Sequence, residues 1–122
     1  MIIGIGTDII EVGRIERAMK RSPRFCARVF TPAELEYCIS CNTPAQRFAG
    51  RFAAKEAVAK CLGGSLSWLD VEILSDDNGG PVVRLSNRAS SLANGRKVMV
   101  SISHCRAYAV ACAIAVADDG PV

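Results

Sequence analysis

Two acidic residues in this sequence of 122 residues stand out through their surroundings. Asp8 lies within the apolar run GIGTDII at positions 4–10, and Glu56 is the only acid in the stretch 45–63. A carboxylate in an apolar strand is costly unless something pairs with it. Two carboxylates suit Mg²⁺, because this ion prefers oxygen ligands and completes its shell with waters and substrate phosphates. The two acids therefore predict a shared magnesium site.

Basic residues accompany Glu56 at helical spacing. Lys60 follows it by four residues, which places both on one face of a helix. Cations beside a magnesium ion would hold substrate phosphates, because the ion relieves the repulsion between acid and phosphate. A plain exposed pair of Glu56 with Lys60 is the simpler alternative. The neighbouring stripe of candidate phosphate contacts is Arg47, Arg51 and Lys55.

A second basic group lies between residues 14 and 28. A solvated helix face normally mixes both signs of charge, whereas this stretch has Glu16 as its single acid. The formal net charge of the whole chain is only +3, so the excess is local. It indicates an acidic or polyanionic partner. The bases are Arg14, Arg17, Lys20, Arg21, Arg24 and Arg28.

A strand and three helices are expected to position these residues. Residues 2–10 alternate as a strand does, with Asp8 on the same side as Gly4 and Gly6. The two glycines predict a bare patch of backbone that a ligand could approach. The expected helices span residues 11–21, 32–38 and 45–63. Pro23 ends the first or starts a new turn, Thr31 and Glu34 form a capping box for the second, and Gly63 closes the third.

The second half of the chain predicts strands. Residues 70–86 fit two strands joined by a turn at 78–80. Residues 97–104 and 108–117 fit a final pair of strands, the second with an alanine face against which a helix could pack closely. A helical interpretation of that last segment stays open, because alanine favours helices.

Length and composition are those of one ordinary domain, which we expect over residues 1–117, with a frayed tail at 118–122. No uncharged apolar run is long enough to span a membrane, and no signal peptide is visible, which predicts a soluble, cytoplasmic protein. The six cysteines fit reduced, packed thiols. Cys38 and Cys41 form a CxxC pair, but no second pair or nearby histidine completes a zinc set.

Three sequence blocks resemble the signatures of the holo-acyl-carrier-protein synthase family. The blocks are GIGTDIIEVGRIERAM at 4–19, GRFAAKEAVAK at 50–60 and VSISHCRAYAVA at 100–111. The resemblance implies a compact α+β fold. It also implies transfer of phosphopantetheine from coenzyme A to a serine of apo-acyl carrier protein, with release of adenosine 3′,5′-bisphosphate. Asp8 and Glu56 match the family's magnesium ligands, and Lys60 matches the lysine beside them.

Further roles come with the resemblance. Phosphoryl transfer needs in-line placement and neutralised charge, and Glu56 is the candidate base, directly or through a water. His104, Arg47 and Arg51 are expected to contact coenzyme A phosphates. The family commonly forms a trimer with active sites between subunits. The residues that suit docking of an acidic carrier protein are Arg14, Met19, Arg21, Arg24, Phe25 and Arg28.

Two alternatives remain at this stage. A nucleic-acid-binding module could use the basic stretch, but it lacks interleaved aromatic residues and leaves Asp8 unexplained. A different magnesium-dependent enzyme acting on coenzyme A or nucleotides would share the metal site. The products of the reaction would separate this second alternative from the transferase.

Overall fold

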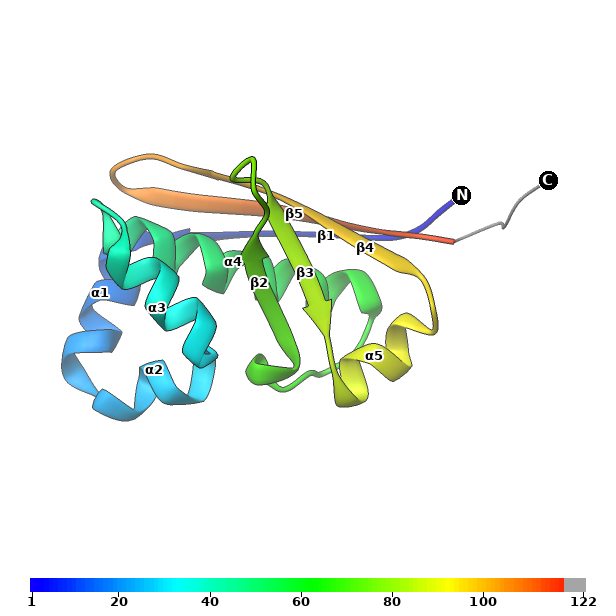
Figure 1. Ribbon diagram of the computed structural model, residues 1–122, viewed down its shortest axis with the longest axis horizontal. Coiled ribbons are helices and arrows are strands. Elements are labelled where there is room, and N and C mark those ends of the chain that lie inside the picture. The colour runs from blue at the N-terminus through cyan, green and yellow to red at the C-terminus, as the bar shows by residue number, and fades with distance from the viewer. Residues whose placement is uncertain (118–122) are drawn as a thin grey trace.

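A three-stranded antiparallel sheet forms one layer of the molecule. The structure is a computed structural model that describes residues 1–117. The strand order is β1 (Ile2–Glu11), β5 (Tyr108–Val116) and β4 (Lys97–His104), so β5 is central and the other two strands form the edges. Figure 1 shows this sheet along the top of the molecule, with the helices beneath it. The last segment is therefore a strand, and the helical alternative for it is wrong.

The long helix α4 (Pro44–Leu62) packs directly against one face of the sheet (Figure 1). A β-carbon at Gly4 or Gly6 would overlap a main-chain oxygen of α4, that of Cys61 or of Ala57. The expectation that these glycines leave backbone open to a ligand is wrong, because the helix occupies that space. The alanine face of β5 is buried as predicted, with Ala109, Ala111, Ala113 and Ala115 at 2% exposure or less.

Three short helices cover the first half of α4. Helix α1 (Val12–Arg21) buries Val12 and Ile15, and α2 (Pro23–Val29) starts at the proline that the sequence placed after α1. Helix α3 (Pro32–Ser40) begins with the predicted capping box, in which Thr31 and Glu34 exchange hydrogen bonds. Proline at the first helical position fits both α2 and α3, because its missing N–H has no partner there anyway.

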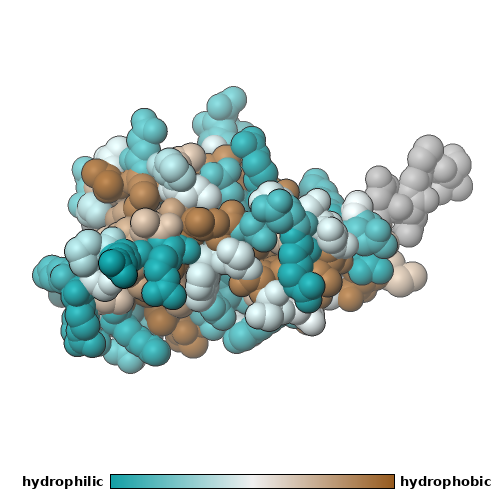
Figure 2. All heavy atoms as spheres, turned by 90° about the horizontal axis from the view of Figure 1, so that it is seen from below, coloured by the Kyte–Doolittle hydropathy of each residue, from teal (hydrophilic) through white to brown (hydrophobic). Residues whose placement is uncertain are grey.

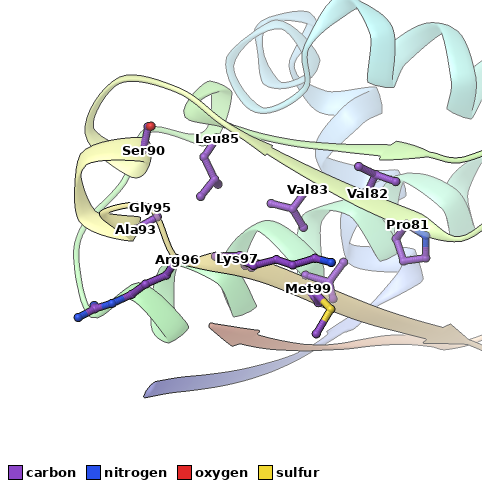
Figure 3. A pocket seen from close by; sticks show the side chains of 12 residues that line it. Pro81, Val82, Val83, Leu85, Ser90, Ala93, Gly95, Arg96, Lys97 and Met99 are labelled. Atoms are coloured by element: carbon purple, nitrogen blue, oxygen red, sulfur yellow. The ribbon is translucent and has the colours of Figure 1, made fainter. Parts of the chain in front are cut away.

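The predicted hairpin is present, with β2 (Val71–Ser75) pairing antiparallel to β3 (Pro81–Leu85). A single 3₁₀ turn, η1 (Trp68–Asp70), precedes it, and a short helix, α5 (Asn87–Ala93), follows it. Neither element was predicted, because both are shorter than two helical turns and show no periodic pattern. A cavity of about 630 Å³ separates β3, α5 and β4, and Figure 3 shows Val83 and Leu85 of β3 on one side of it.

The apolar side chains form two clusters. One lies between the sheet, α4 and the hairpin, and the other lies among α1 to α4 around Phe30 and Phe48. Ile10 packs against both clusters, which ties the two ends of the molecule together. The α+β fold class is confirmed, whereas one domain over residues 1–117 stays a prediction. The expected frayed tail at 118–122 lies outside the described residues.

No helix within residues 1–117 has both the length and the apolar character that crossing a membrane requires. The predicted cytoplasmic location is untested and stays a prediction.

Candidate active site

Asp8 lies on the face of β1 that α4 covers, on the same side of the strand as Gly4 and Gly6. Its carboxylate meets Lys60 of α4, whose Nζ lies 3.3 Å from Asp8 Oδ1 and donates to the Thr7 carbonyl oxygen at 3.0 Å. The Asp8 side chain is 17% exposed and that of Lys60 is 55% exposed. The ion pair therefore opens to solvent at the β1 edge of the sheet, where a ligand can reach it.

Glu56 lies on α4 one turn before Lys60 and is half-buried. Burial raises the pKa of its carboxyl group, the charge of Asp8 raises it further, and Lys60 opposes both effects. The two acids are thus close enough for their charges to interact, although they are far apart in the sequence. This juxtaposition fits a divalent cation, because two facing carboxylates repel each other unless a positive charge lies between them.

The protein supplies few ligands to such a cation. Among residues 1–117, no cluster of three or more histidine, cysteine or acidic side chains could hold a metal ion. Asp8 and Glu56 would therefore leave open positions for water and substrate oxygens. This donor set suits Mg²⁺, which binds through one or two carboxylates plus substrate phosphates in many enzymes.

A second group of predicted residues gathers on the other flank of α4. Arg47, Arg51 and His104 line one small cleft of about 90 Å³, which we call the arginine cleft. Its other walls include Gly79 and Pro81 from the hairpin. The structure thus brings together three of the four predicted phosphate contacts, drawn from α4 and from the end of β4.

Arg51 is held in place within the arginine cleft. The side chain is 5% exposed, its Nη2 donates to Ser75 Oγ at 2.9 Å, and its guanidinium carbon lies 4.3 Å from the centre of the Tyr37 ring. Within residues 1–117, the buried Nε atoms of Arg47 and Arg51 have no hydrogen-bond partner. Buried donors without partners are costly, so the cleft is suited to an anion that would accept from them. Sequence reasoning missed Tyr37 and Ser75, since neither stands in a recognisable motif.

Lys55 does not join the arginine cleft, although the sequence placed it among the phosphate contacts. Its side chain is 1% exposed, and its ammonium group forms an ion pair with Glu34 of α3, with Nζ 2.7 Å from Oε1. Burial lowers the pKa of Lys55, and the charge of Glu34 opposes this effect. We correct the prediction: an ammonium enclosed in the core and already paired there has no free donor for a substrate phosphate.

The predicted docking residues lie on α1 and α2. Arg14, Arg21, Arg24 and Arg28 are all exposed. Figure 2 shows hydrophilic side chains at the end of the molecule where α1 and α2 lie, with hydrophobic surface between them. A cavity of about 380 Å³ at this end is lined by Arg21, Phe25 and Arg28 together with Phe52 and Trp68. Met19 lines a neighbouring cavity. Trp68 was not predicted to take part, because it is distant in the sequence.

The CxxC pair gives no sign of redox chemistry, whereas hydrogen bonds from the backbone lower the pKa of the exposed Cys105 thiol. All six thiols are free. Burial raises the pKa of Cys38 to about 12, so this member of the CxxC pair carries no thiolate near neutral pH. The structure therefore favours plain packed thiols at Cys38 and Cys41.

The two predicted groups lie on opposite flanks of α4. Asp8 and Lys60 meet at the β1 edge of the sheet, with Glu56 one turn before Lys60 on α4, whereas the arginine cleft is built against the β4 edge. Strand β5 lies between these edges. The acids that suit a metal ion and the cleft that suits an anion are therefore separate within one chain. We call these two groups the half-sites.

Known proteins share both the sequence and the fold. Residues 4–113 match the 4′-phosphopantetheinyl transferase superfamily. A holo-[acyl-carrier-protein] synthase of Moorella thermoacetica is 52% identical over 115 residues, covering 89% of this chain and 90% of that protein. A holo-ACP-synthase structure from Plasmodium yoelii superposes with a TM-score of 0.86 at 38% identity, with 98% of each chain covered.

A further solved structure contains a ligand. The Helicobacter pylori holo-[acyl-carrier-protein] synthase, solved in complex with coenzyme A, superposes with a TM-score of 0.82 at 34% identity. The match covers 91% of this chain and 98% of that one. The chain thus belongs to the 4′-phosphopantetheinyl transferase superfamily and, within it, to the holo-[acyl-carrier-protein] synthases. The family and the enzyme class predicted from the three sequence blocks are confirmed.

Proposed function

We propose that this chain transfers the 4′-phosphopantetheine group of coenzyme A to a serine hydroxyl of apo-acyl carrier protein, releasing adenosine 3′,5′-bisphosphate. The observation that carries the proposal is the contact of Asp8 with Lys60 at the open β1 edge, with Glu56 one helical turn before Lys60 and within reach of the charge of Asp8. Two acids and a lysine suit a reaction in which a diphosphate must be bound and its charge neutralised.

Asp8 and Glu56 would hold Mg²⁺ through their carboxylate oxygens. When bound, the ion supplies charge neutralisation and polarises the phosphorus that the serine attacks. Lys60 stabilises the negative charge of the diphosphate through its ammonium group, which the Thr7 carbonyl and Asp8 keep directed toward this edge. Glu56 takes the proton of the serine hydroxyl, directly or through a water.

Arg47, Arg51 and His104 bind the nucleotide end of coenzyme A. The arginine cleft offers buried donors without partners, and an adenosine bisphosphate supplies acceptors for them. The complex of the Helicobacter pylori relative with coenzyme A supports the choice of ligand.

We further propose that the active enzyme is a homotrimer with each active site between two subunits. The two half-sites of one chain lie on opposite flanks of α4, so a neighbouring chain would complete each of them. The sheet face that α4 leaves uncovered is apolar, with Ile5 74%, Ile9 61% and Tyr108 46% exposed. An exposed apolar surface of this kind is typical of an interface. The number of three comes from the family resemblance.

The acidic carrier protein would dock on α1 and α2. Arg14, Arg21, Arg24 and Arg28 provide the charge complementarity, while Met19 and Phe25 provide apolar contacts. The cavity beside Phe25 places apolar surface within the basic patch, which is the usual composition of a protein interface.

One experiment tests the transfer. The protein is incubated with coenzyme A, apo-acyl carrier protein and Mg²⁺, and the carrier mass is measured. We expect the carrier to gain one phosphopantetheine group with the wild type and with Glu36→Gln, which changes an exposed acid on α3. Asp8→Asn and Glu56→Gln should each abolish the gain. Hydrolysis of coenzyme A without any change in carrier mass would favour a different magnesium-dependent enzyme.

A further inference from the structure

A buried ion pair joins α4 to α3 near the hairpin, away from both half-sites. The side chains of Lys55 and Glu34 are 1% and 0% exposed, and their charged atoms lie 2.7 Å apart. Lys55 Nζ also donates to the main-chain oxygen of Trp68 at 2.9 Å and to that of Val71 at 2.6 Å. An ammonium group has three donors, so all of them are used, and they reach α3, η1 and β2.

Glu34 extends this network to the chain before α3 and to the hairpin. Its Oε1 accepts from the Thr31 N–H at 2.8 Å, and its Oε2 accepts from the Ile73 N–H at 2.8 Å. The Thr31 hydroxyl donates in turn to Glu72 on the neighbouring position of β2. Through these bonds α3, α4 and β2 share one set of directed contacts, with the Lys55–Glu34 pair buried at its centre.

The position of Lys55 along α4 gives this network a functional consequence. Lys55 directly precedes Glu56 and follows Arg51 by one helical turn. A change in the rotation or height of α4 at Lys55 would move Glu56 relative to Asp8. The same change would move Arg51 relative to Ser75 and the hairpin turn that lines the arginine cleft.

We propose that the Lys55–Glu34 ion pair is a positioning device, which sets the rotation and height of α4 so that Glu56 faces Asp8 while Arg51 faces the hairpin. Neither residue touches substrate. The proposal deepens the proposed function and rests on it for the roles of Glu56 and Arg51. It reassigns Lys55 from a phosphate contact to a residue that acts through its neighbours on α4.

Positioning can be separated from stability, because the two depend on different properties of the pair. Replacing a buried ion pair by apolar residues of similar volume is often neutral or stabilising for the fold. Apolar side chains would still hold α3, α4 and β2 together, but they lack the directed bonds that select one arrangement. A variant with an apolar pair that stays folded would thus lose the positioning.

The test is the double variant Lys55→Met/Glu34→Leu, compared with the wild type and with Glu36→Gln. Glu36→Gln is the control, because it removes the charge of an exposed acid on α3 that takes no part in the network. Urea unfolding measures stability. Calorimetry measures the affinity for Mn²⁺ without coenzyme A and, separately, the affinity for adenosine 3′,5′-bisphosphate in the presence of a chelator.

We expect the double variant to stay folded with a lower urea midpoint than the wild type, because the main-chain groups that Lys55 and Glu34 bond lose their partners. Its affinities for Mn²⁺ and for the bisphosphate should each fall at least fivefold. A fall in only one of the two affinities would mean that the ion pair positions only the residues on that flank of α4. Affinities within twofold of the wild type would overturn the proposal. Loss of the folded state, seen by circular dichroism, would also overturn it, because the pair would then serve the stability of the whole domain.

Failure of the proposed function would look different. In that case Asp8→Asn and Glu56→Gln, in the wild-type background, would leave the Mn²⁺ affinity unchanged. Bisphosphate binding in the presence of a chelator would still report on the Lys55–Glu34 pair, since it does not depend on the metal.

Discussion

Lys60 of α4 bonds Asp8 of β1 across the edge of the sheet, with Nζ 3.3 Å from Oδ1, and this contact joins the two sequence segments that hold the proposed metal site. The same ammonium group donates to the Thr7 carbonyl, so its position is fixed by two acceptors on β1. Lys60 therefore balances the charge of Asp8 at the edge where we propose that the diphosphate binds.

The first prediction concerns Lys60. Replacing it by methionine keeps the length of the side chain and removes the charge, so the transition state loses one electrostatic contact. We expect kcat to fall about 10²-fold, the scale found when one such donor is removed. Lys97→Met, which changes an exposed lysine of β4, is the control. Steady-state kinetics with a carrier substrate checks the result, and an unchanged kcat would remove Lys60 from the mechanism.

The second prediction concerns the pH dependence of metal binding. Burial and Asp8 raise the pKa of Glu56, and metal binding requires its ionised form. The Mn²⁺ affinity should therefore fall about tenfold per pH unit below that raised pKa. For the stability of the metal-free protein, the dependence on pH has the opposite sign. The raised pKa favours the neutral carboxyl, so its contribution to stability is full below the ordinary carboxyl pKa and is lost as the pH rises through the raised value.

The variant Asp8→Asn tests the interaction between the same two acids in a second way. In the metal-free protein it should lower the pKa of Glu56, because the charge of Asp8 is removed, but burial should keep that pKa above the ordinary range. Carbon-13 NMR of the glutamate carboxyl groups measures the shift. If the substitution left the pKa of Glu56 unchanged, the charges of the two acids would not interact.

The third prediction tests how closely α4 packs on β1. Gly6→Ala places a β-carbon against the main-chain oxygen of Ala57, and neither backbone can move away easily. We expect a loss of about 3 kcal/mol in the free energy of unfolding, the upper part of the usual range for overpacking. Gly13→Ala on α1 is the control, because its β-carbon would meet only the flexible end of Arg17. The urea midpoints of both variants are measured. Equal midpoints would contradict the close packing of α4 on β1 at Gly6.

The fourth prediction concerns carrier docking. Arg24→Glu and Arg28→Glu each reverse a charge on the surface proposed to meet the acidic carrier, so each should raise KM for the carrier about tenfold and leave KM for coenzyme A unchanged. The increase should shrink at high salt, because salt screens exposed charges. Arg96→Glu, which changes an exposed residue between α5 and β4 (Figure 3), is the control and should leave both constants unchanged.

The fifth prediction concerns assembly. Ile5→Asp places a charge in the exposed apolar face of the sheet, where the side chain is 74% exposed in the single chain. A monomer should tolerate this change, whereas an assembly that covers this face should dissociate. Light scattering should give the mass of three chains for the wild type and one chain for the variant, with loss of activity in the variant. A wild-type mass of one chain would refute the trimer.

The amino-acid sequence alone determined most of the local structure. Alternation predicted β1 and β5, the capping box at Thr31 and Glu34 predicted the start of α3, and Gly63 predicted the end of α4, because these signals act within a few residues. The three signature blocks also identified the family. The short elements η1 and α5 were not predicted, because packing stabilises them and their sequences show no periodic pattern.

Only the tertiary structure decided which side chains meet. The spacing on α4 gave Lys55 and Arg51 the same apparent role, yet Lys55 is paired with Glu34 in the core while Arg51 lines a cleft with His104. The glycines of β1 looked open, and α4 covers them. Periodicity assigns a residue to a face of its own element, but burial and charge pairing depend on which other element packs against that face, and that is set by contacts between distant parts of the chain.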